Sequence, residues 1–381
     1  MVVVDESEVE FLSSPAEFYD TLVRLASEAT ERVNIATLYI GNTDLELNLL
    51  RYLADKPTNI LIDGLRGNRK ESSGLSSIEM IKTHCPSARV VEFTSPLFKG
   101  LYARLPDRIR EIVGTQHMKL FVADDTVVIT GANLSRIYFT NRQDRYVVIR
   151  NKAFADSVSD VFLSQRTAME DEMTPNSPAT VHIGHSVQRG FDFPHTGQTD
   201  SVTESLLADQ IDQDVKVTLS SPYLNLSTGI LANIQKLNNV EIITNSTETN
   251  AFFGSNGPSR FIPAAYSILQ DDLLQTIRSR NVSVVEYSRP GWSFHAKGVW
   301  VSRPSGEVCE TIIGSSNFGF RSQFRDLEVS FRMRSESPRI QSQLTQERDR
   351  ILKYCKPATP AVRKQPVWLK YLTRGPLRTF L

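Results

Sequence analysis

The chain has 381 residues, enough for two ordinary α/β domains that each bury a core. Its 43 basic residues balance its 43 acidic residues, so no overall field selects nucleic acid as a partner. Hydrophobic residues make up 40% of the chain, but no run approaches the roughly eighteen apolar residues of a membrane-spanning helix.

The first half of the chain alternates predicted helices and strands. Ser14 and Pro15 open an amphipathic helix that runs to about Thr30, because Ser is a good helix cap and Pro suits the first turn. Further helices are expected near Asp44–Ala54, Ser76–Thr83 and Lys152–Asp171, and strands at Val33–Leu38, Asn59–Asp63, Arg89–Phe93, His117–Ala123, Thr126–Thr130 and Arg145–Ile149.

The second half repeats this order. Helices are expected near Thr203–Ile211 and Pro338–Tyr354, and strands at Val215–Leu219, Val240–Thr244, Ser283–Tyr287, His295–Val301, Glu310–Ile313 and Leu327–Phe331. We therefore predict an α/β fold of two tandem domains, residues 1–175 and 201–381, each a mixed sheet covered by helices and related to the other by a pseudo-twofold axis. Residues 176–200, rich in Pro, Ser, Thr, His and Gly, are the expected linker.

One short pattern occurs in both halves. His117-Met118-Lys119 is followed by Asn133 and Asp144, and His295-Ala296-Lys297 is followed by Asn317 and Glu328. The spacing from Asn to acid is eleven residues in both copies (144 − 133 and 328 − 317). The spacing from His to Asn differs by six residues, and the turn-rich RPSGE after Ser302 has room for that insertion. The matched spacing indicates an internal duplication, with one active site where the two domains meet.

The pattern favours phosphoryl or phosphatidyl transfer. Residues i and i+2 of a strand share a face, so each copy presents an imidazole beside an ammonium group. One neutral imidazole attacks phosphorus while the other, protonated, donates to the leaving oxygen. The lysines and asparagines supply donors to the phosphoryl oxygens, and the two acids orient the histidines.

These motifs resemble the HxKx4D/GxxN signature of the phospholipase D superfamily. More narrowly, the chain resembles the eukaryotic, mitochondrial type of phosphatidylglycerophosphate synthase. The stretches that carry this likeness span both halves: residues 131–135, 138–146, 221–226, 251–254, 262–266, 291–298 and 314–322. The resemblance implies two phospholipase D-like domains that transfer a phosphatidyl group from CDP-diacylglycerol to glycerol-3-phosphate, release CMP and serve cardiolipin synthesis. It also implies His117 as the nucleophile and His295 as the general acid and base.

The resemblance also implies a cellular location, and the second motif differs from the signature at one position. It implies a peripheral protein on the matrix face of the mitochondrial inner membrane. We expect the transit peptide to be absent from this chain, because MVVVDESEVEF is acidic rather than Arg-rich. The first motif continues to Asp124, whereas the second has Ser302 at that position. Asp124 is grouped with the catalytic residues of its motif, although in the superfamily this acid usually has a structural role.

Several further residues are candidates for substrate binding. Arg66 and Arg69 lie in a basic loop after a predicted strand, where loops of open α/β sheets bind ligands, and guanidinium groups hold phosphates well. The alternative is a solvated basic turn. The segments around Asn133 and Asn317, here called the Asn turns, contain further candidates for substrate binding: Ser135, Ser315, Arg142, Arg145 and Arg321. For each arginine the alternative is a structural ion pair. The three cysteines lack metal-ligand spacing, so no metal or other cofactor is expected.

Three segments are candidates for contact with an anionic membrane. Residues 351–381 hold seven basic residues and no acid, interleaved with aromatic residues, and each such charge near the surface contributes roughly 1 kcal/mol. Residues 96–102 and 251–254 are predicted loops with more apolar side chains than a loop needs. The alternatives are a tail packed on its own domain and loops that plug the core.

Two other functions stay open at this level. The same histidines serve phospholipase D-type hydrolases and phosphodiesterases, although the neutral charge disfavours nucleic acid as a substrate. A catalytically inactive lipid-binding protein is disfavoured because both His-Lys pairs and both Asn-acid partners are present. The sequence leaves open whether the chain forms a homodimer.

Overall fold

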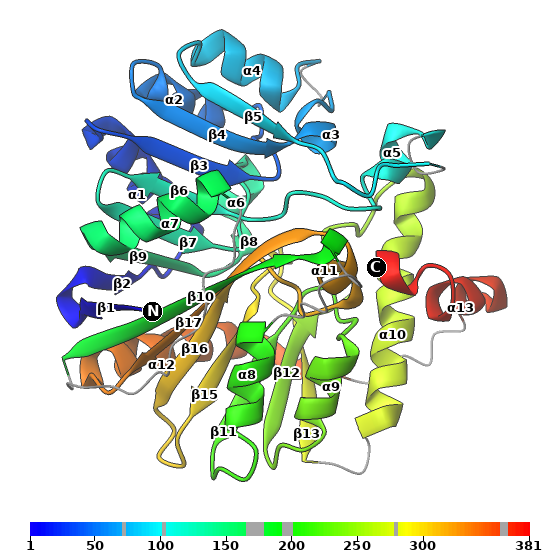
Figure 1. Cartoon of the computed structure of the whole chain (residues 1–381). Coiled ribbons are helices and arrows are strands. Elements are labelled where there is room, and N and C mark those ends of the chain that lie inside the picture. The colour runs from blue at the N-terminus through cyan, green and yellow to red at the C-terminus, as the bar shows by residue number, and fades with distance from the viewer. Residues whose placement is uncertain (71–73, 101–103, 165–178, 193–200, 278–280, 359–364) are drawn as a thin grey trace.

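The computed structural model describes the chain except for residues 71–73, 101–103, 165–178, 193–200, 278–280 and 359–364. Two twisted sheets with helices on their faces form the upper and lower parts of the molecule in Figure 1. The first sheet comes from the N-terminal half and the second mostly from the C-terminal half, as the sequence predicts.

The first sheet has seven strands. Their order is β2 (Val9–Phe11), β9 (Tyr146–Arg150), β7 (Thr126–Thr130), β6 (Leu120–Ala123), β3 (Val33–Thr37), β4 (Thr58–Asp63) and β5 (Arg89–Phe93). The strands β3, β4 and β5 are parallel, and the others pair antiparallel. The mixed sheet is therefore confirmed.

The second sheet repeats this order and extends it. Its strands are β1 (Val2–Asp5), β10 (Thr180–Arg189), β17 (Leu327–Ser335), β16 (Val308–Gly314), β15 (Gly298–Ser302), β11 (Lys216–Ser220), β12 (Val240–Asn245), β13 (Val282–Tyr287) and β18 (Cys355–Pro357). The run β17-β16-β15-β11-β12-β13 matches β9-β7-β6-β3-β4-β5, including the parallel triple. The structure thus confirms the duplication seen in the motifs.

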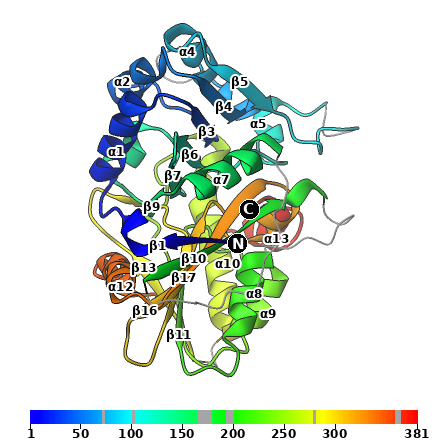
Figure 2. The same cartoon turned by 60° about the vertical axis from the view of Figure 1, so that its left-hand side comes forward.

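The helices form layers around the sheets (Figure 2). The helices α1 (Pro15–Glu28), α2 (Asp44–Leu53) and α4 (Ser77–His84) cover the outer face of the first sheet, and each begins at a Ser or Thr that supports a capping interaction. The helices α8 (Ser201–Asp209), α9 (Thr228–Ile234) and α10 (Ile262–Ile277) cover the second sheet. Between the sheets, α7 (Lys152–Ser164) and α12 (Pro338–Leu352) share one core with strands of both halves. This shared core fixes the two motif strands relative to each other.

The predicted linker requires a correction. Residues 176–200 contain β10, which lies between β1 and β17 in the second sheet. The polar composition of this segment favoured a linker, although its apolar residues alternate as they do in a strand. Three of them, Val181, Ile183 and Val187, are buried. The strand β1 crosses from the N-terminus into the same sheet (Figure 1), so the predicted boundary at residue 175 does not separate the two sheets. Residues 165–171 of the expected helix lie outside the described residues.

Candidate active site

The two halves bring their motifs together by exchanging segments. The stretch before β6 runs beside the start of β17, where the His117 amide donates to the Leu327 carbonyl at 2.8 Å. The stretch before β15 runs beside the short strand β8 (Arg142–Gln143), where the His295 amide donates to the Gln143 carbonyl at 2.8 Å. Each His-x-Lys segment therefore lies against the acid-bearing segment of the other half.

This exchange determines which acid meets which histidine. The His117 Nδ1 lies 2.9 Å from both carboxylate oxygens of Glu328, and the His295 Nδ1 lies 2.7 Å from Asp144 Oδ2. A carboxylate only accepts hydrogen bonds, so each imidazole carries a proton on Nδ1 and presents Nε2 to the site. These distances suit the predicted role of the acids in orienting the histidines, and each acid contacts the histidine of the other half.

The two motif strands begin later than predicted. The strands β6 and β15 begin at Leu120 and Gly298, so both His-x-Lys stretches are extended lead-ins rather than strand residues. Each lysine still turns back to its histidine: Lys119 Nζ donates to the His117 carbonyl at 2.5 Å, and Lys297 Nζ to the His295 carbonyl at 2.9 Å. Besides burial, Lys297 lowers the pKa of His117, and Lys119 lowers that of His295, so the two imidazoles and the two amines lie close together.

Burial tunes the charges of these groups. It lowers the pKa of Lys119 to about 7 and that of Lys297 to about 8. Burial, reinforced by the neighbouring lysine of each motif, lowers the pKa of both imidazoles well below their usual range. Burial also raises the pKa of Asp144 to about 6. Both imidazoles are therefore neutral at pH 7 before substrate binds, which suits a nucleophile.

The two histidines differ in access. The His117 side chain is 12% exposed, whereas that of His295 is 5% exposed. The Tyr138 hydroxyl lies 3.2 Å from His295 Nε2 and also accepts from Asn133 Nδ2 at 3.2 Å. The buried Oδ1 atoms of Asn133 and Asn317 have no hydrogen-bond partner among the described residues. The more accessible nitrogen is thus that of His117.

Asp124 is the clearest departure from the predicted site. It lies in the turn between β6 and β7 with a left-handed backbone, which Asp tolerates, and its carboxylate accepts from the amides of residues 30–32. Asp124 is five residues after Lys119, which is roughly 16 Å along an extended strand. The equivalent Ser302 is buried and accepts from Arg348 on α12. Because both positions are structural, Ser302 leaves the catalytic groups intact.

Two of the three arginines in the Asn turns lie near the catalytic histidines, and the third does not. Arg142 Nε donates to Ser293 at 2.9 Å and its guanidinium lies 4.5 Å from the Tyr138 ring, beside His295. Arg321 is near His117 but binds the Asp326 carboxylate and the Glu111 carbonyl.

Of the two roles predicted for Arg145, substrate binding and a structural ion pair, the structure favours the ion pair. Its guanidinium is buried against the Trp300 ring and paired with Glu347 of α12 at 2.7 Å. It also donates to Thr311 and to the Ile312 carbonyl. Arg145 therefore joins the two halves.

The predicted serines take supporting positions. Ser315 accepts from the Val329 amide at 3.0 Å and so holds the backbone beside Glu328. The equivalent residue is Gly131, where an added side chain would lie 2.7 Å from Asp144 Oδ1. Ser135 Oγ lies 3.5 Å from the Tyr39 hydroxyl. The serines thus contact residues next to the catalytic groups and support their positions.

The basic loop lies at the carboxyl end of β4. Arg66 is in the short helix α3 (Gly64–Gly67), with its guanidinium 4.2 Å from the centre of the Tyr39 ring. Arg69 lies 3.6 Å from Glu111. The Asp63 carboxylate caps this helix and also accepts from the Gln116 amide at 3.0 Å, which ties the loop to the segment that carries His117. The loop is therefore next to the site.

Two tyrosines escaped the sequence prediction as site residues. Tyr39 follows β3 and Tyr223 follows β11, and each backbone carbonyl accepts from a hydroxyl two residues earlier, that of Thr37 or Ser221. The Tyr223 ring lies 6.2 Å from the His295 ring. The spacing from tyrosine to Asn is 94 residues in both halves (133 − 39 and 317 − 223). Extending the comparison of the halves upstream of the motifs would have found them.

Comparison with known proteins decides the family. The chain is 30% identical to the Homo sapiens protein named CDP-diacylglycerol–glycerol-3-phosphate 3-phosphatidyltransferase, mitochondrial, over 97% of this chain and 82% of that protein. The Gallus gallus protein of the same name is 29% identical, over 97% of this chain and 83% of its own. The chain belongs to this family. The resemblance stated from the motifs is thereby confirmed, although no family model matches the chain.

A solved structure supports the fold of this phosphatidyltransferase family member. Phosphatidylserine synthase from Haemophilus influenzae aligns with a TM-score of 0.78 over 100% of this chain and 97% of its own, at 18% identity. The likeness at this identity concerns the fold alone. It confirms the predicted phospholipase D-like architecture.

Proposed function

We propose that the chain transfers the phosphatidyl group of CDP-diacylglycerol to glycerol-3-phosphate through a phosphohistidine at His117. Family membership gives the reaction, and the exchanged His–carboxylate pairs carry the proposed mechanism. Two imidazoles held by separate carboxylates at one site supply a nucleophile and a separate proton carrier.

The first step forms the covalent intermediate. The Nε2 lone pair of His117 attacks the phosphorus that bears diacylglycerol, and the bond from this phosphorus to the oxygen bridging to CMP breaks. His295 donates a proton to that oxygen, and CMP leaves. The anionic diphosphate raises the proton affinity of His295, so His295 takes up this proton from solvent when the donor binds. Lys119 and Lys297 neutralise the charge that builds on the phosphoryl oxygens.

The second step reverses these roles. A hydroxyl of glycerol-3-phosphate gives its proton to His295 and attacks phosphorus, and the bond from phosphorus to His117 breaks. Phosphatidylglycerophosphate leaves, His117 is neutral again, and His295 releases the proton that it took from the hydroxyl. The acceptor also carries a phosphate, and the guanidinium groups of Arg66 and Arg69 near the site suit it.

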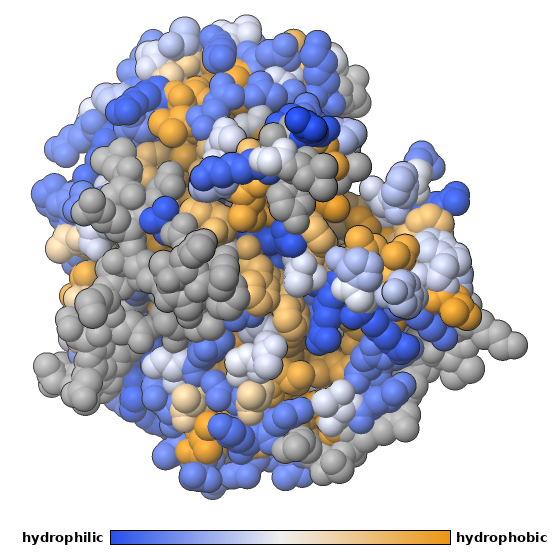
Figure 3. Space-filling model, turned by 45° about the vertical axis from the view of Figure 1, so that its right-hand side comes forward, coloured by the Kyte–Doolittle hydropathy of each residue, from blue (hydrophilic) through white to orange (hydrophobic). Residues whose placement is uncertain are grey.

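Membrane binding belongs to the same proposal because the donor and the product are lipids. The exposed apolar residues include Phe253 in a loop and Val367, Trp368 and Tyr371 on α13 (Val367–Arg374). The helix α13 packs on α10, and Trp368 contacts Phe261 just before that helix. Figure 3, in which this face comes forward, shows hydrophobic side chains interspersed with hydrophilic ones. Neighbouring Phe252 contacts Tyr223 near His295, so the loop at Phe253 lies close to the catalytic groups.

The remainder of the tail is packed on its own domain. Asn225 donates to the Arg378 carbonyl, and Arg325 donates to the Thr379 carbonyl. Arg363 and Lys364, two of the predicted membrane-binding residues, lie outside the described residues. In the other candidate loop Leu97 packs against the core, whereas Leu101 and Tyr102 are outside the described residues. We therefore assign the membrane contact to α13 and to the loop at Phe253.

None of the described helices combines the length and apolar composition that crossing a bilayer requires. Peripheral binding through α13, at the matrix face of the mitochondrial inner membrane, is the location that we propose. Replacing Trp368 and Tyr371 by Ser should weaken cosedimentation with anionic liposomes roughly tenfold, since two aromatic anchors are lost. The control is Tyr52→Ser, another exposed tyrosine, on α2. Equal liposome binding by the double variant would remove α13 from the membrane face.

The reaction itself has a direct test. The protein is mixed with CDP-diacylglycerol in detergent micelles, and CMP release is followed with and without glycerol-3-phosphate. We expect release to depend on the acceptor, with phosphatidylglycerophosphate as the product. Equal release without acceptor, with phosphatidic acid as the product, would favour the hydrolase instead.

A further inference from the structure

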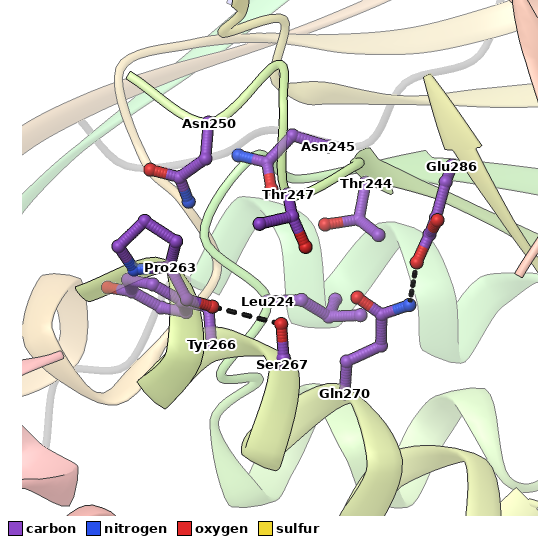
Figure 4. Close-up of a pocket in the computed structure, with 10 residues that line it drawn as sticks. All are labelled: Leu224, Thr244, Asn245, Thr247, Asn250, Pro263, Tyr266, Ser267, Gln270 and Glu286. Atoms are coloured by element: carbon purple, nitrogen blue, oxygen red, sulfur yellow. Dashed lines mark hydrogen bonds between the residues drawn. The ribbon is translucent and has the colours of Figure 1, made fainter. Parts of the chain in front are cut away.

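A polar pocket opens beside the catalytic groups in the C-terminal half (Figure 4). It lies at the carboxyl end of the parallel strands β11, β12 and β13, with α10 as its opposite wall. This end of a parallel sheet is where open α/β folds bind ligands. Together with the open space in front of it, the pocket has an empty volume of about 290 Å³. It is distinct from the histidine site yet close to it.

Tyr223 separates the pocket from the catalytic histidines. Its ring is 6.2 Å from the His295 ring and 5.1 Å from the ring of Tyr266, which lines the pocket. The pocket is therefore on the His295 side of the site. A group that leaves phosphorus next to His295 points toward it.

The lining selects a neutral, polar ligand. Among the described residues, none of the ten that line the pocket is Lys or Arg, and Glu286 supplies a negative charge. A phosphate group is disfavoured there by repulsion, and an acyl chain by the desolvation of the amides and hydroxyls. Most of the lining carries donors or acceptors: Thr244, Asn245, Thr247, Asn250, Ser267 and Gln270.

These side chains are held in place by one another. The Gln270 amide nitrogen donates to Glu286 Oε1 at 2.6 Å, which leaves the Gln270 carbonyl oxygen as an acceptor (Figure 4). Asn245 Nδ2 donates to the Pro222 carbonyl at 2.6 Å, which leaves its carbonyl oxygen as an acceptor. Fixed amides and a carboxylate beside an aromatic wall are the groups that proteins use to read the edge of a base.

We infer that this pocket holds the cytidine of the CDP-diacylglycerol donor, with Glu286 accepting from the exocyclic amino group of cytosine. The inference rests on the proposed function and adds the origin of donor recognition. Cytosine presents an amino group where uracil presents a carbonyl oxygen, and a carboxylate accepts from the first and repels the second. Tyr266 supplies a face for stacking.

The inference also explains the division of labour between the histidines. With cytidine in this pocket, the departing phosphate of CMP is next to His295, which is the proposed proton donor. His117 then attacks from the opposite side of phosphorus, in line with the leaving oxygen. The geometry of the pocket thus supports the same assignment as the access of the two imidazoles.

The test compares Glu286→Gln with the control Glu241→Gln. Glu241 lies on β12, pairs with Lys216 and does not line the pocket. Kinetics are measured with CDP-diacylglycerol and glycerol-3-phosphate, and the binding of CMP and UMP is measured by equilibrium dialysis. For Glu286→Gln we expect the KM for the donor and the Kd for CMP to rise roughly tenfold, with the acceptor KM unchanged. The preference for CMP over UMP should disappear. Glu241→Gln should match the wild type.

Two outcomes would overturn the inference: equal binding of CMP and UMP by the wild-type protein, or unchanged CMP binding in Glu286→Gln. If that variant does not fold, Gln270→Leu removes the partner of Glu286 and takes its place in both assays. Loss of the proposed function would appear differently, as a wild-type protein that transfers no phosphatidyl group. Nucleotide binding is measured without turnover, so it tests the pocket in either case.

Discussion

The carboxyl ends of the parallel strands differ between the two halves, although the strand order is the same. In the N-terminal half this end carries Arg66 and Arg69 beside Tyr39, and in the C-terminal half it carries the amides and Glu286 around Tyr266. One end suits a phosphate and the other a neutral base. We propose that duplication supplied two similar motifs and that divergence beside them supplied separate binding sites for the acceptor and the donor.

The part that did not diverge is the exchange of acids across the pseudo-twofold axis. Glu328 binds His117 and Asp144 binds His295, so neither half is a complete catalyst. The largest effect that we expect concerns these acids. Glu328→Gln and Asp144→Asn should each lower kcat by about 10²–10⁴, because an amide donates to Nδ1 and stabilises the wrong tautomer. Steady-state assays on folded protein measure this.

A buried carboxylate without a catalytic partner provides the control. Glu310 pairs with Arg332 at 2.5 Å, so Glu310→Gln should affect stability and spare kcat. Retention of more than about one tenth of the activity by Glu328→Gln or Asp144→Asn would contradict the exchanged arrangement.

The second prediction concerns the join between the halves. Arg145→Met should lower the free energy of unfolding by about 3–5 kcal/mol, because Glu347 is left buried without its partner. The KM values of the folded fraction should not change. Chemical denaturation and kinetics on the same preparation measure both. A raised KM with unchanged stability would return Arg145 to the substrate site.

Local patterns explain how much of the fold was predictable. The strands β5 and β7 have the predicted bounds, and α1 and α2 end within two residues of theirs, because caps and alternating apolar residues are local signals. The strands β1 and β10 were missed because β10 pairs with β17 and β1 pairs with β10, and both partners are far away in the chain. Such pairing leaves little trace in composition.

The site divides in the same way. Spacing alone identified His117, His295, their lysines and the two acids, because the duplication repeats the same pattern in both halves. Spacing grouped Asp124 with the catalytic residues and left the role of Arg145 open, because it does not say whether a side chain faces the site, a sheet neighbour or a turn. The crossing of Glu328 to His117 depends on how the halves pack, which no local pattern encodes.

A third prediction tests the difference between the two ends. Arg66→Ala and Arg69→Ala should each raise the KM for glycerol-3-phosphate roughly tenfold, because a charge-assisted contact to its phosphate is lost. The KM for CDP-diacylglycerol should stay unchanged, the reverse of the result expected for Glu286→Gln. The control is Arg51→Ala, in the last turn of α2. An unchanged acceptor KM in both variants would make the loop a solvated turn.

A smaller effect is expected from pH. As the pH rises through the pKa values of Lys119 and Lys297, about 7 and about 8, the site loses the charges that stabilise the phosphoryl oxygens. As the pH falls through the Asp144 pKa of about 6, its protonated carboxyl no longer supports a charged His295. The profile of kcat/KM should therefore be bell-shaped. A flat profile from about pH 5.5 to 9 would contradict these charge states.

The central claim is that the duplicated histidines act in unequal roles through a covalent intermediate on His117. Exchange of labelled CMP into CDP-diacylglycerol without glycerol-3-phosphate tests it most directly, followed by mass spectrometry of protein that is denatured without acid, because acid breaks the bond between phosphorus and histidine. We predict exchange in the wild type, no exchange in His117→Asn, and a phosphatidyl group on His117 in the wild type or in His295→Asn. A phosphatidyl group on His295 of the His117→Asn variant would invert the roles, and an active wild-type enzyme without exchange would establish direct displacement instead.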